Sequence, residues 1–303
     1  MKPINRLIFS LTVFFMVVLY SNQSFAQQII ISVEELVYDN FMRWTSDKKV
    51  DEINNYNTIY SNKGTVELIL LHQALKASEE EFEIKLIPTS NIRKERYLVA
   101  SGVVHIAAQC LWYKNINKND FFVSHPVLGK GEYEKGIYAL RKNRAVFKTK
   151  TVEDLRKFKA IVLKNESPDL STLKAMNIKD IIVVPDLKNI YSYLYHKKAD
   201  FVLFNLSENN DFSKSFRIKI DKKYGRRTVK IVRKVKLYPI KNIKIGLQGS
   251  LHYITTKKSI NAENVYKILD KGIKALLEKK LFKKAFTESR SINYRVIDWK
   301  QIF

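Results

Sequence analysis

The sequence predicts an α/β protein made of two lobes. Strand and helix patterns alternate through most of the chain after residue 26, which is typical of sheets covered by helices. Hydrophobic residues make up 46% of the 303 residues, and the chain has only nine Gly and six Pro, so we expect it to fold throughout. Because no linker-like stretch separates the alternating sets, the lobes should be joined by short crossings.

The first alternating set runs from residue 64 to residue 111. Apolar residues at helical spacing predict a helix over 64–78, and period-2 alternation predicts a strand over 82–87. A second helix is expected over 92–100, ending at Gly102. The nearly continuous apolar run 105–111 is typical of a strand that is buried on both faces of a parallel sheet.

A second set follows from residue 136. Thr151 is the expected N-cap of a helix, because an acidic residue follows three positions later. Further strands are expected over 136–140, 160–163, 181–184 and 201–204, with helices over 170–176 and 187–197. Two extended segments, 217–220 and 229–237, and two C-terminal helices, 262–276 and 281–286, complete the chain. We therefore expect lobe 1 to comprise 27–136 and 239–303, and lobe 2 to comprise 137–238.

The first 26 residues have the pattern of a secretory signal. Lys2 and Arg6 precede the apolar run 7–20, and small residues lead to a cleavage position after Ala26. The run is shorter than the about 20 residues that span a bilayer, which disfavours the alternative of a membrane anchor. We expect a signal peptide over 1–26 and a periplasmic mature protein.

Charge and cysteine content limit the classes of partner and of chemistry. The net charge is +24, but the 54 basic residues include only 13 Arg and are widely spread, with one dense stretch at 222–236. This pattern favours a solvated, Lys-rich surface over nucleic-acid binding, and leaves contact with anionic envelope surfaces open. Cys110 is the only cysteine, so no intrachain disulfide can form, and its apolar neighbours predict a buried, inert thiol.

The sequence contains no strong catalytic or metal-binding signature. The five His residues show no pairing at metal-ligand spacing, and there is no Gly-x-Ser-x-Gly, His-Glu-x-x-His or Gly-rich phosphate loop. We therefore expect no cofactor, no metal and no catalysis, although a Ser or Cys nucleophile assembled in space stays open.

Polar and aromatic residues near predicted strand ends and helix starts are the candidate ligand contacts. Helix starts offer free backbone N–H groups, and aromatic faces beside a few polar groups are common in small-molecule pockets. Turn, capping, packing and surface roles are the alternatives for these side chains. The candidates are Tyr60, Ser61, Asn62, Arg96, Gln109, Trp112, Asn165, Asn205 and Glu208.

Several short strings occur in an order that carries a family resemblance. They are Leu70-Leu71 with Ala74-Leu75, Lys130-Gly131, the segment 151–155, Pro168-Asp169, Ala199-Asp200-Phe201, Glu208 and Tyr238-Pro239. In this order the chain, from about Tyr60 to the C-terminal helices, resembles the periplasmic solute-binding proteins of family 3, and among them the transporter substrate-binding-domain proteins. The resemblance implies a bilobal type II periplasmic-binding-protein-like fold, with two mixed sheets flanked by helices and with hinge crossings.

The same resemblance implies a function. It implies a monomer that binds a small polar or charged solute between its lobes for an inner-membrane transporter or a signalling partner. Amino-acid-binding members carry an Arg after the central strand that clamps the ligand carboxylate, whereas the nearest cations in this chain are Lys114 and Lys118, so amino-acid specificity is not implied. The chain departs from the family pattern at three other places. It has Glu134-Lys135-Gly136 where the family usually carries Gly-Tyr-Arg, and Ser167 where the family carries a tryptophan before Pro-Asp. It has Phe204-Asn205 where the family carries Arg-Gly before the acidic residue.

Two alternatives stay open. One is a periplasmic dehydratase or lyase on the same scaffold, which would use a carboxylate of perturbed pKa, with Glu166, Asp169 or Glu208 as the candidates. The other is a sensory adaptor that presents its closed form to a membrane partner.

Overall fold

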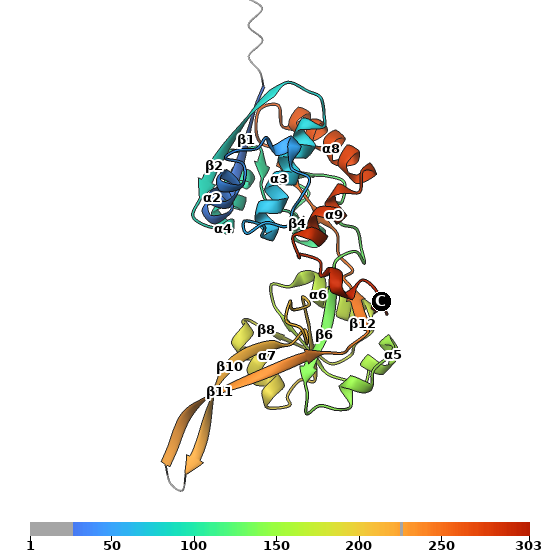
Figure 1. The fold of residues 1–303 in the computed structure, drawn as a ribbon. Coiled ribbons are helices and arrows are strands. Elements are labelled where there is room, and N and C mark those ends of the chain that lie inside the picture. The colour runs from blue at the N-terminus through green and yellow to red at the C-terminus, as the bar shows by residue number, and fades with distance from the viewer. Residues whose placement is uncertain (1–26, 225–226) are drawn as a thin grey trace, which may run out of the picture.

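The computed structural model describes residues 27–224 and 227–303, so the expected signal peptide over 1–26 lies outside the described residues. Two lobes lie one above the other in Figure 1, joined by a narrow waist. Within the described ranges, no helix is both long and apolar enough to cross a membrane.

Lobe 1 is built on a five-stranded mixed sheet in the order β2-β1-β3-β14-β5. The strands are β1 (Gln27–Glu34), β2 (Phe82–Thr89), β3 (Ile106–Ala107), β5 (Phe121–Val123) and β14 (Ile254–Thr256). Strand β1 pairs in parallel with β2 and β3, whereas β14 runs antiparallel to β3 and β5. Strand β1, which the sequence analysis did not predict, is thus an interior strand of this sheet.

Helices flank the sheet of lobe 1. They are α2 (Glu35–Trp44), α3 (Lys63–Lys76), α4 (Ile92–Ser101), α8 (Ala262–Glu278) and α9 (Leu281–Glu288), with the short 3-10 turns η1 (Val50–Glu52) and η2 (Tyr113–Asn115). Helix α3 is buried on nearly all sides, and α8 packs so closely on it that a Cβ at Gly272 would overlap the carbonyl oxygen of Ala74. The C-terminal helices therefore complete the core that the N-terminal half begins.

Lobe 2 is built on a second mixed sheet, in the order β10-β11-β6-β9-β7-β8. The strands are β6 (Glu134–Leu140), β7 (Ala160–Leu163), β8 (Ile181–Val184), β9 (Phe201–Phe204), β10 (Lys214–Tyr224) and β11 (Arg227–Pro239). The associated helices are η3 (Val146–Lys148), α5 (Val152–Leu155), α6 (Ser167–Ala175) and α7 (Leu187–Tyr195). Thr151 caps α5 in a capping box with Asp154, as its sequence predicts.

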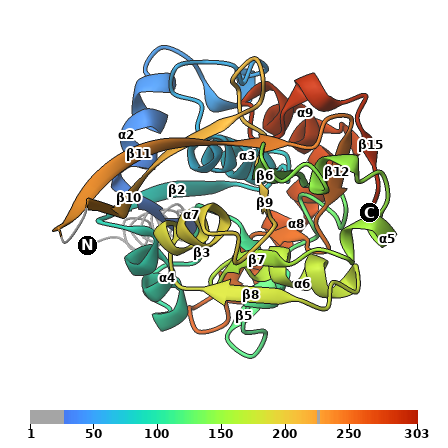
Figure 2. The same cartoon turned by 90° about the horizontal axis from the view of Figure 1, so that it is seen from below.

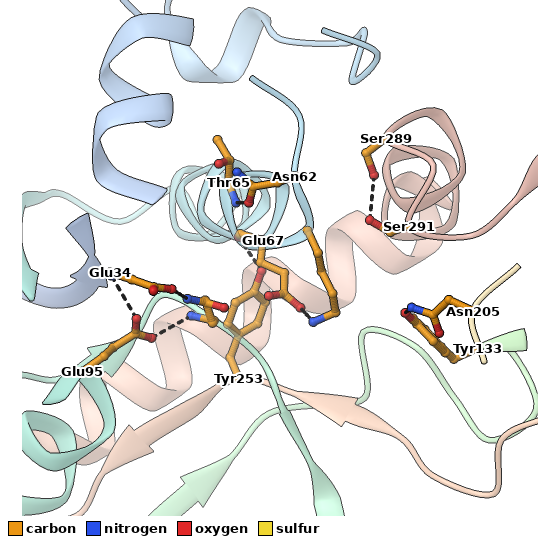
Figure 3. Close-up of polar contacts among 12 residues, drawn as sticks. Glu34, Asn62, Thr65, Glu67, Glu95, Tyr133, Asn205, Tyr253, Ser289 and Ser291 are labelled. Atoms are coloured by element: carbon orange, nitrogen blue, oxygen red, sulfur yellow. Dashed lines mark hydrogen bonds and ion pairs between the residues drawn. The ribbon is translucent and has the colours of Figure 1, made fainter. Parts of the chain in front are cut away.

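Three segments of the chain cross the waist. The first two, 124–133 and 247–253, run antiparallel, with Leu247 N donating to Tyr133 O at 2.9 Å and Leu251 N donating to Leu128 O at 2.9 Å. The third, 289–293, follows α9, and Figure 3 shows the hydroxyls of Ser289 and Ser291 bonded there, at 3.1 Å. The two-lobed α/β fold with hinge crossings that the sequence predicts is confirmed by these sheets and crossings.

The lobe boundaries at 136 and 239 remain a proposal, which the strand pairing refines. Strand β12 (Ile243–Gly246) pairs with the start of β6, and β15 (Lys300–Gln301) pairs with β12. These two segments, together with the turn η4 (Tyr294–Val296), belong with lobe 2 rather than with lobe 1, because their backbone hydrogen bonds continue its sheet.

One predicted strand was wrong in its length. The apolar run 105–111 forms only β3 and, after a bend, β4 (Leu111–Trp112), which pairs with β13 (Leu251–His252). The chain bends because Gln109 N donates to the Glu95 carboxylate at 3.1 Å instead of to a neighbouring strand. This bend moves Trp112 away from the sheet of lobe 1 and toward the waist.

Candidate functional site at the lobe junction

An aromatic and amide group connects the two lobes. Trp112 ends β4 of lobe 1, Tyr133 ends the first crossing, and Asn205 follows β9 of lobe 2. The ring centroids of Trp112 and Tyr133 are 5.5 Å apart with planes at 88°, and Asn205 Nδ2 donates to Tyr133 Oη at 3.1 Å, as Figure 3 shows. Tyr133 is only 6% exposed, so a change in the angle between the lobes must disturb its contacts.

A lysine–carboxylate pair lies at the start of α3. Asn62 caps this helix by accepting a hydrogen bond from Thr65 N at 3.0 Å, and Lys63 Nζ donates to the carboxylate of Glu67 one turn later. Glu67 is fully buried, its Oε2 has no hydrogen-bond partner among the described residues, and the Lys63 side chain keeps 36% exposure. Glu67, which Figure 3 shows, is therefore a buried carboxylate whose counterion is partly exposed.

The ionisation of this pair depends on burial and on mutual attraction. Burial raises the pKa of Glu67, and Lys63 opposes that rise. Burial acts to lower the pKa of Lys63, but the neighbouring Glu67 outweighs it, so the net shift of the Lys63 pKa is upward. Lys63 thus keeps its positive charge at the lobe junction.

Tyr253 and Cys110 lie behind this pair. Tyr253 Oη donates to the backbone oxygen of Glu67 at 2.6 Å, and Tyr253 is fully buried. Cys110 is buried, and burial together with Glu67 raises the pKa of its thiol well above the ordinary value. The prediction that Cys110 is buried is confirmed, and its thiolate is disfavoured.

Gln109 belongs to a second buried network in lobe 1. The Glu95 carboxylate accepts from Gln109 N and from Glu34 N, each at 3.1 Å, while Gln109 Nε2 donates to Glu34 at 3.2 Å (Figure 3). Burial raises the pKa of Glu95 to about 7, although both backbone N–H groups oppose the shift. These bonds fix the bend that carries Trp112.

A matching lysine–carboxylate pair lies in lobe 2. Lys135 in β6 contacts Asp169 in α6 at 2.8 Å and Glu166 at 3.5 Å. Burial raises the pKa of Asp169 to about 6 against the opposing effect of Lys135. Burial acts to lower the pKa of Lys135, yet the two carboxylates outweigh it and the net shift is upward. Lys135 therefore stays charged near the waist.

Direct bonds also hold α6 against the waist. Lys114 Nζ of lobe 1 donates to Ser171 Oγ at 2.7 Å, and Gln248 N of the second crossing donates to Thr172 Oγ1 at 2.8 Å. Gly249 fits between Trp112 and Pro168, since a Cβ there would come within 3.2 Å of both side chains. These polar contacts and the close approach at Gly249 supplement an apolar cluster that continues through the crossing residues Leu128, Tyr133 and Leu251 from one lobe to the other.

The remaining predicted residues are dispersed. Tyr60 packs half-buried against the core, Ser61 Oγ donates to Tyr56 O, and Arg96 and Asn165 are exposed with no side-chain hydrogen bond among the described residues. Glu208 is exposed and pairs with Arg290 beside the third crossing at 2.8 Å. Of the predicted set, the structure brings Trp112 and Asn205 together, through Tyr133.

Sequence reasoning missed Lys63, Glu67 and Tyr133, and it noted Lys135 only as a departure from a family pattern. One signal was available for the first pair. Glu67 interrupts the apolar helical run 66–71, and Lys63 precedes it by four residues, the spacing at which side chains meet on a helix. No comparable local signal marks Tyr133, because its partners come from distant segments.

A cavity of about 850 Å³ lies in lobe 2 at the base of β11, away from these residues. Apolar side chains including Phe147, Tyr238 and Ile243 form part of its wall. Six cations also line it, namely Arg141, Arg144, Lys148, Lys150, Lys241 and Lys300.

Comparison with known proteins gives matches to solved structures alone: no family model and no curated protein matches the chain. An amino acid ABC transporter substrate-binding protein, AbpA, from Streptococcus pneumoniae bound to L-arginine is 14% identical, with a TM-score of 0.45 over 87% of this chain and 94% of that one. Substrate binding domain 2 of GlnP from Lactococcus lactis, in an open conformation, is 10% identical, with a TM-score of 0.48 over 88% and 97%. The periplasmic VFT2 domain of BvgS from Bordetella pertussis is 10% identical, with a TM-score of 0.48 over 91% and 93%.

Proposed function

We propose that this protein binds a small polar or charged solute at the junction of its two lobes and closes on it by hinge motion. The observation that supports this most is the group formed by Trp112, Tyr133 and Asn205, which links lobe 1, a crossing and lobe 2 by one aromatic contact and one hydrogen bond. A solute that contacts this group would bias the angle between the lobes.

The charges around the junction indicate the kind of solute. Burial raises the pKa of the Tyr133 hydroxyl, and both Lys63 from lobe 1 and Lys135 from lobe 2 act against that rise, so the two ammonium groups are close enough to act on one phenol. Because Lys63 pairs with Glu67 and Lys135 pairs with Asp169, the junction offers charges of both signs, which suits a polar or charged solute. We propose Lys63, Gln109, Trp112, Tyr133 and Asn205 as the residues that contact or position it.

The cellular setting is part of the same proposal. With the expected signal peptide over 1–26, the protein would act in the periplasm as a monomer and would deliver its solute to an inner-membrane transporter or report it to a sensor. Neither role needs catalysis or a cofactor.

The test has two steps. Native mass spectrometry of the purified protein identifies a co-purified solute, and X-ray scattering then measures compaction as that solute, or a library of small carboxylates, phosphates and amines, is added. We expect compaction with at least one compound. No compaction with any compound in the library would overturn the proposal.

A tyrosine variant then locates the site. Tyr133→Phe removes one hydrogen bond and should weaken solute binding about two- to tenfold in calorimetry. Tyr97→Phe is the matched control, because Tyr97 is 62% exposed on α4, and it should leave affinity unchanged. Equal affinity in both variants would place the site elsewhere.

One observation favours a second candidate, a dehydratase or lyase. Asp169 is a carboxylate whose burial raises its pKa to about 6, and it lies beside Lys135 at the junction, so it could exchange a proton near neutral pH. A turnover assay with the co-purified compound tests this: loss of turnover in Asp169→Asn, with binding retained, would favour the enzyme.

A further inference from the structure

The hairpin formed by β10 and β11 concentrates much of the positive charge of the chain. Eleven of the 54 Lys and Arg residues lie within 214–237, and Asp221 is the only acidic residue in that segment. Figure 1 and Figure 2 both show the hairpin extending well beyond the body of lobe 2. This share of the charge is therefore displayed on a projecting arm.

The register of the ladder collects cations on one face. Arg217 lies opposite Lys234, Ser215 lies opposite Lys236, and Lys219 lies opposite Val232. Directly opposed residues share a face and alternate residues repeat it, so Lys230, which lies opposite Asp221, joins the same row. We call Arg217, Lys219, Lys230, Lys234 and Lys236 the cationic hairpin face, and all five are exposed. Val232, which lies in the same row, is 62% exposed.

The opposite face anchors the base of the hairpin. Phe216, Ile218 and Leu237 are buried in the core of lobe 2, and Phe216 stacks on Tyr191 of α7 with centroids 4.1 Å apart and planes at 9°. Because these contacts fix the base, the cationic hairpin face points away from the lobe in a set orientation. A nearby carboxylate, Asp211, reaches Lys236 only at 4.0 Å.

We propose that the cationic hairpin face docks the protein onto the surface of a bilayer rich in anionic phospholipid. Four of its five cations are Lys, which act as point charges rather than as bidentate readers, and a row of point charges suits anionic headgroups that it does not need to read individually. The face carries an exposed Val and no aromatic side chain on which nucleic-acid bases could stack, which disfavours a single-stranded nucleic acid. The surface is independent of the solute site.

Binding to lipid vesicles tests the proposal. The protein processed at Ala26 is sedimented with vesicles of phosphatidylcholine alone or of phosphatidylcholine mixed with phosphatidylglycerol. Each Lys or Arg near an anionic surface strengthens binding about fivefold. Replacing all five residues of the cationic hairpin face by Gln should therefore weaken binding to the mixed vesicles roughly a hundredfold or more, and added salt should weaken wild-type binding.

A matched control separates this face from overall charge. The control variant replaces five exposed lysines of lobe 1 by Gln and so makes the same change in net charge: Lys48, Lys76, Lys85, Lys279 and Lys283. It should bind within a few-fold of wild type. A third variant, with the four lysines of the hairpin face changed to Arg, keeps the charge and should keep binding; unchanged circular dichroism and thermal melts check that each variant folds.

Three outcomes would overturn the proposal: no wild-type binding to the mixed vesicles, equal loss in the hairpin and control variants, or hairpin-dependent binding to duplex DNA or RNA that is tighter than binding to the vesicles. The last outcome would assign the face to a nucleic acid.

Discussion

Replacing Lys135 by Met should lower the free energy of unfolding, because it removes the counterion of the buried Asp169 carboxylate at the lobe junction. The side chains of Lys135 and Asp169 are 9% and 4% exposed, and their charged groups are 2.8 Å apart. Removing the ammonium leaves Asp169 buried without its main counterion, a change that typically costs about 3–5 kcal/mol. We expect a loss of that size in the free energy of unfolding at pH 8.

The pH dependence follows from the sign of the Asp169 shift. Burial raises its pKa from the ordinary 3.8 to about 6 even beside Lys135, which corresponds to about 3 kcal/mol at about 1.36 kcal/mol per pKa unit. A raised pKa in the folded state means that the stability contributed by this group is present below about pH 4 and is lost as the pH rises through about 6. Without Lys135 the pKa rises further, so Lys135→Met should differ from wild type by only about 1 kcal/mol at pH 4.

Urea unfolding of four proteins measures these quantities. Wild type, Lys135→Met, Asp169→Leu and the double variant form a double-mutant cycle, and the double variant should recover most of the stability that Lys135→Met loses. Lys85→Met on the exposed side of β2 is the control, with an expected change within about 0.5 kcal/mol. A loss in Lys135→Met that is the same at pH 4 and pH 8, or smaller than about 1 kcal/mol at pH 8, would refute the reasoning.

Three further predictions concern stability and the waist. Gly272→Ala gains about 1 kcal/mol of helix propensity but forces α8 away from Ala74, so thermal unfolding should show a net loss of about 2 kcal/mol or more; a stabilised variant would contradict the close packing. Because burial raises the pKa of Glu95 to about 7 from an ordinary 4.5, its contribution to stability is lost as the pH rises through about 7. Urea unfolding should therefore show wild type losing about 3 kcal/mol relative to Glu95→Gln between pH 4 and pH 8, and parallel pH profiles would argue against this. Glu208→Gln should cost less than about 1 kcal/mol in the same assay, because its pair with Arg290 is exposed; a larger loss would mean that the third crossing depends on that ion pair.

Local sequence signals were sufficient for most of the fold. The helix over α3, the Thr151 cap of α5 and the strands of lobe 2 follow from periodicity and capping residues that lie within one segment. The strand over 105–111 was predicted too long because the bend at Gln109 depends on Glu95, and that carboxylate lies on another helix. Strand β1 directly follows the expected signal peptide and was not assigned at all.

The candidate site was harder to predict because its contacts are not local. Tyr133 meets Trp112, 21 positions earlier, and Asn205, 72 positions later, only after both lobes have folded. Arg96 was chosen for its residue type in a predicted helix, and the structure leaves it exposed. Glu208 was chosen through the family resemblance, and the structure pairs it with Arg290. Glu67 is a charged residue inside an apolar helical run, and in related chains this pattern indicates a buried carboxylate that needs a counterion.

The pairing of β15 with β12 has a consequence for the order of folding. The sheet of lobe 2 begins with β6 at Glu134, but Gly246 N donates to Phe303 O at 2.9 Å and β12 pairs with Lys300 and Gln301. During synthesis or passage through a membrane, the edge of this lobe therefore stays unpaired until residues 300–303 have emerged. Because this pairing joins segments that are far apart in the sequence, completion of the sheet edge should be slow relative to the formation of the local hairpins and helices of the same lobe.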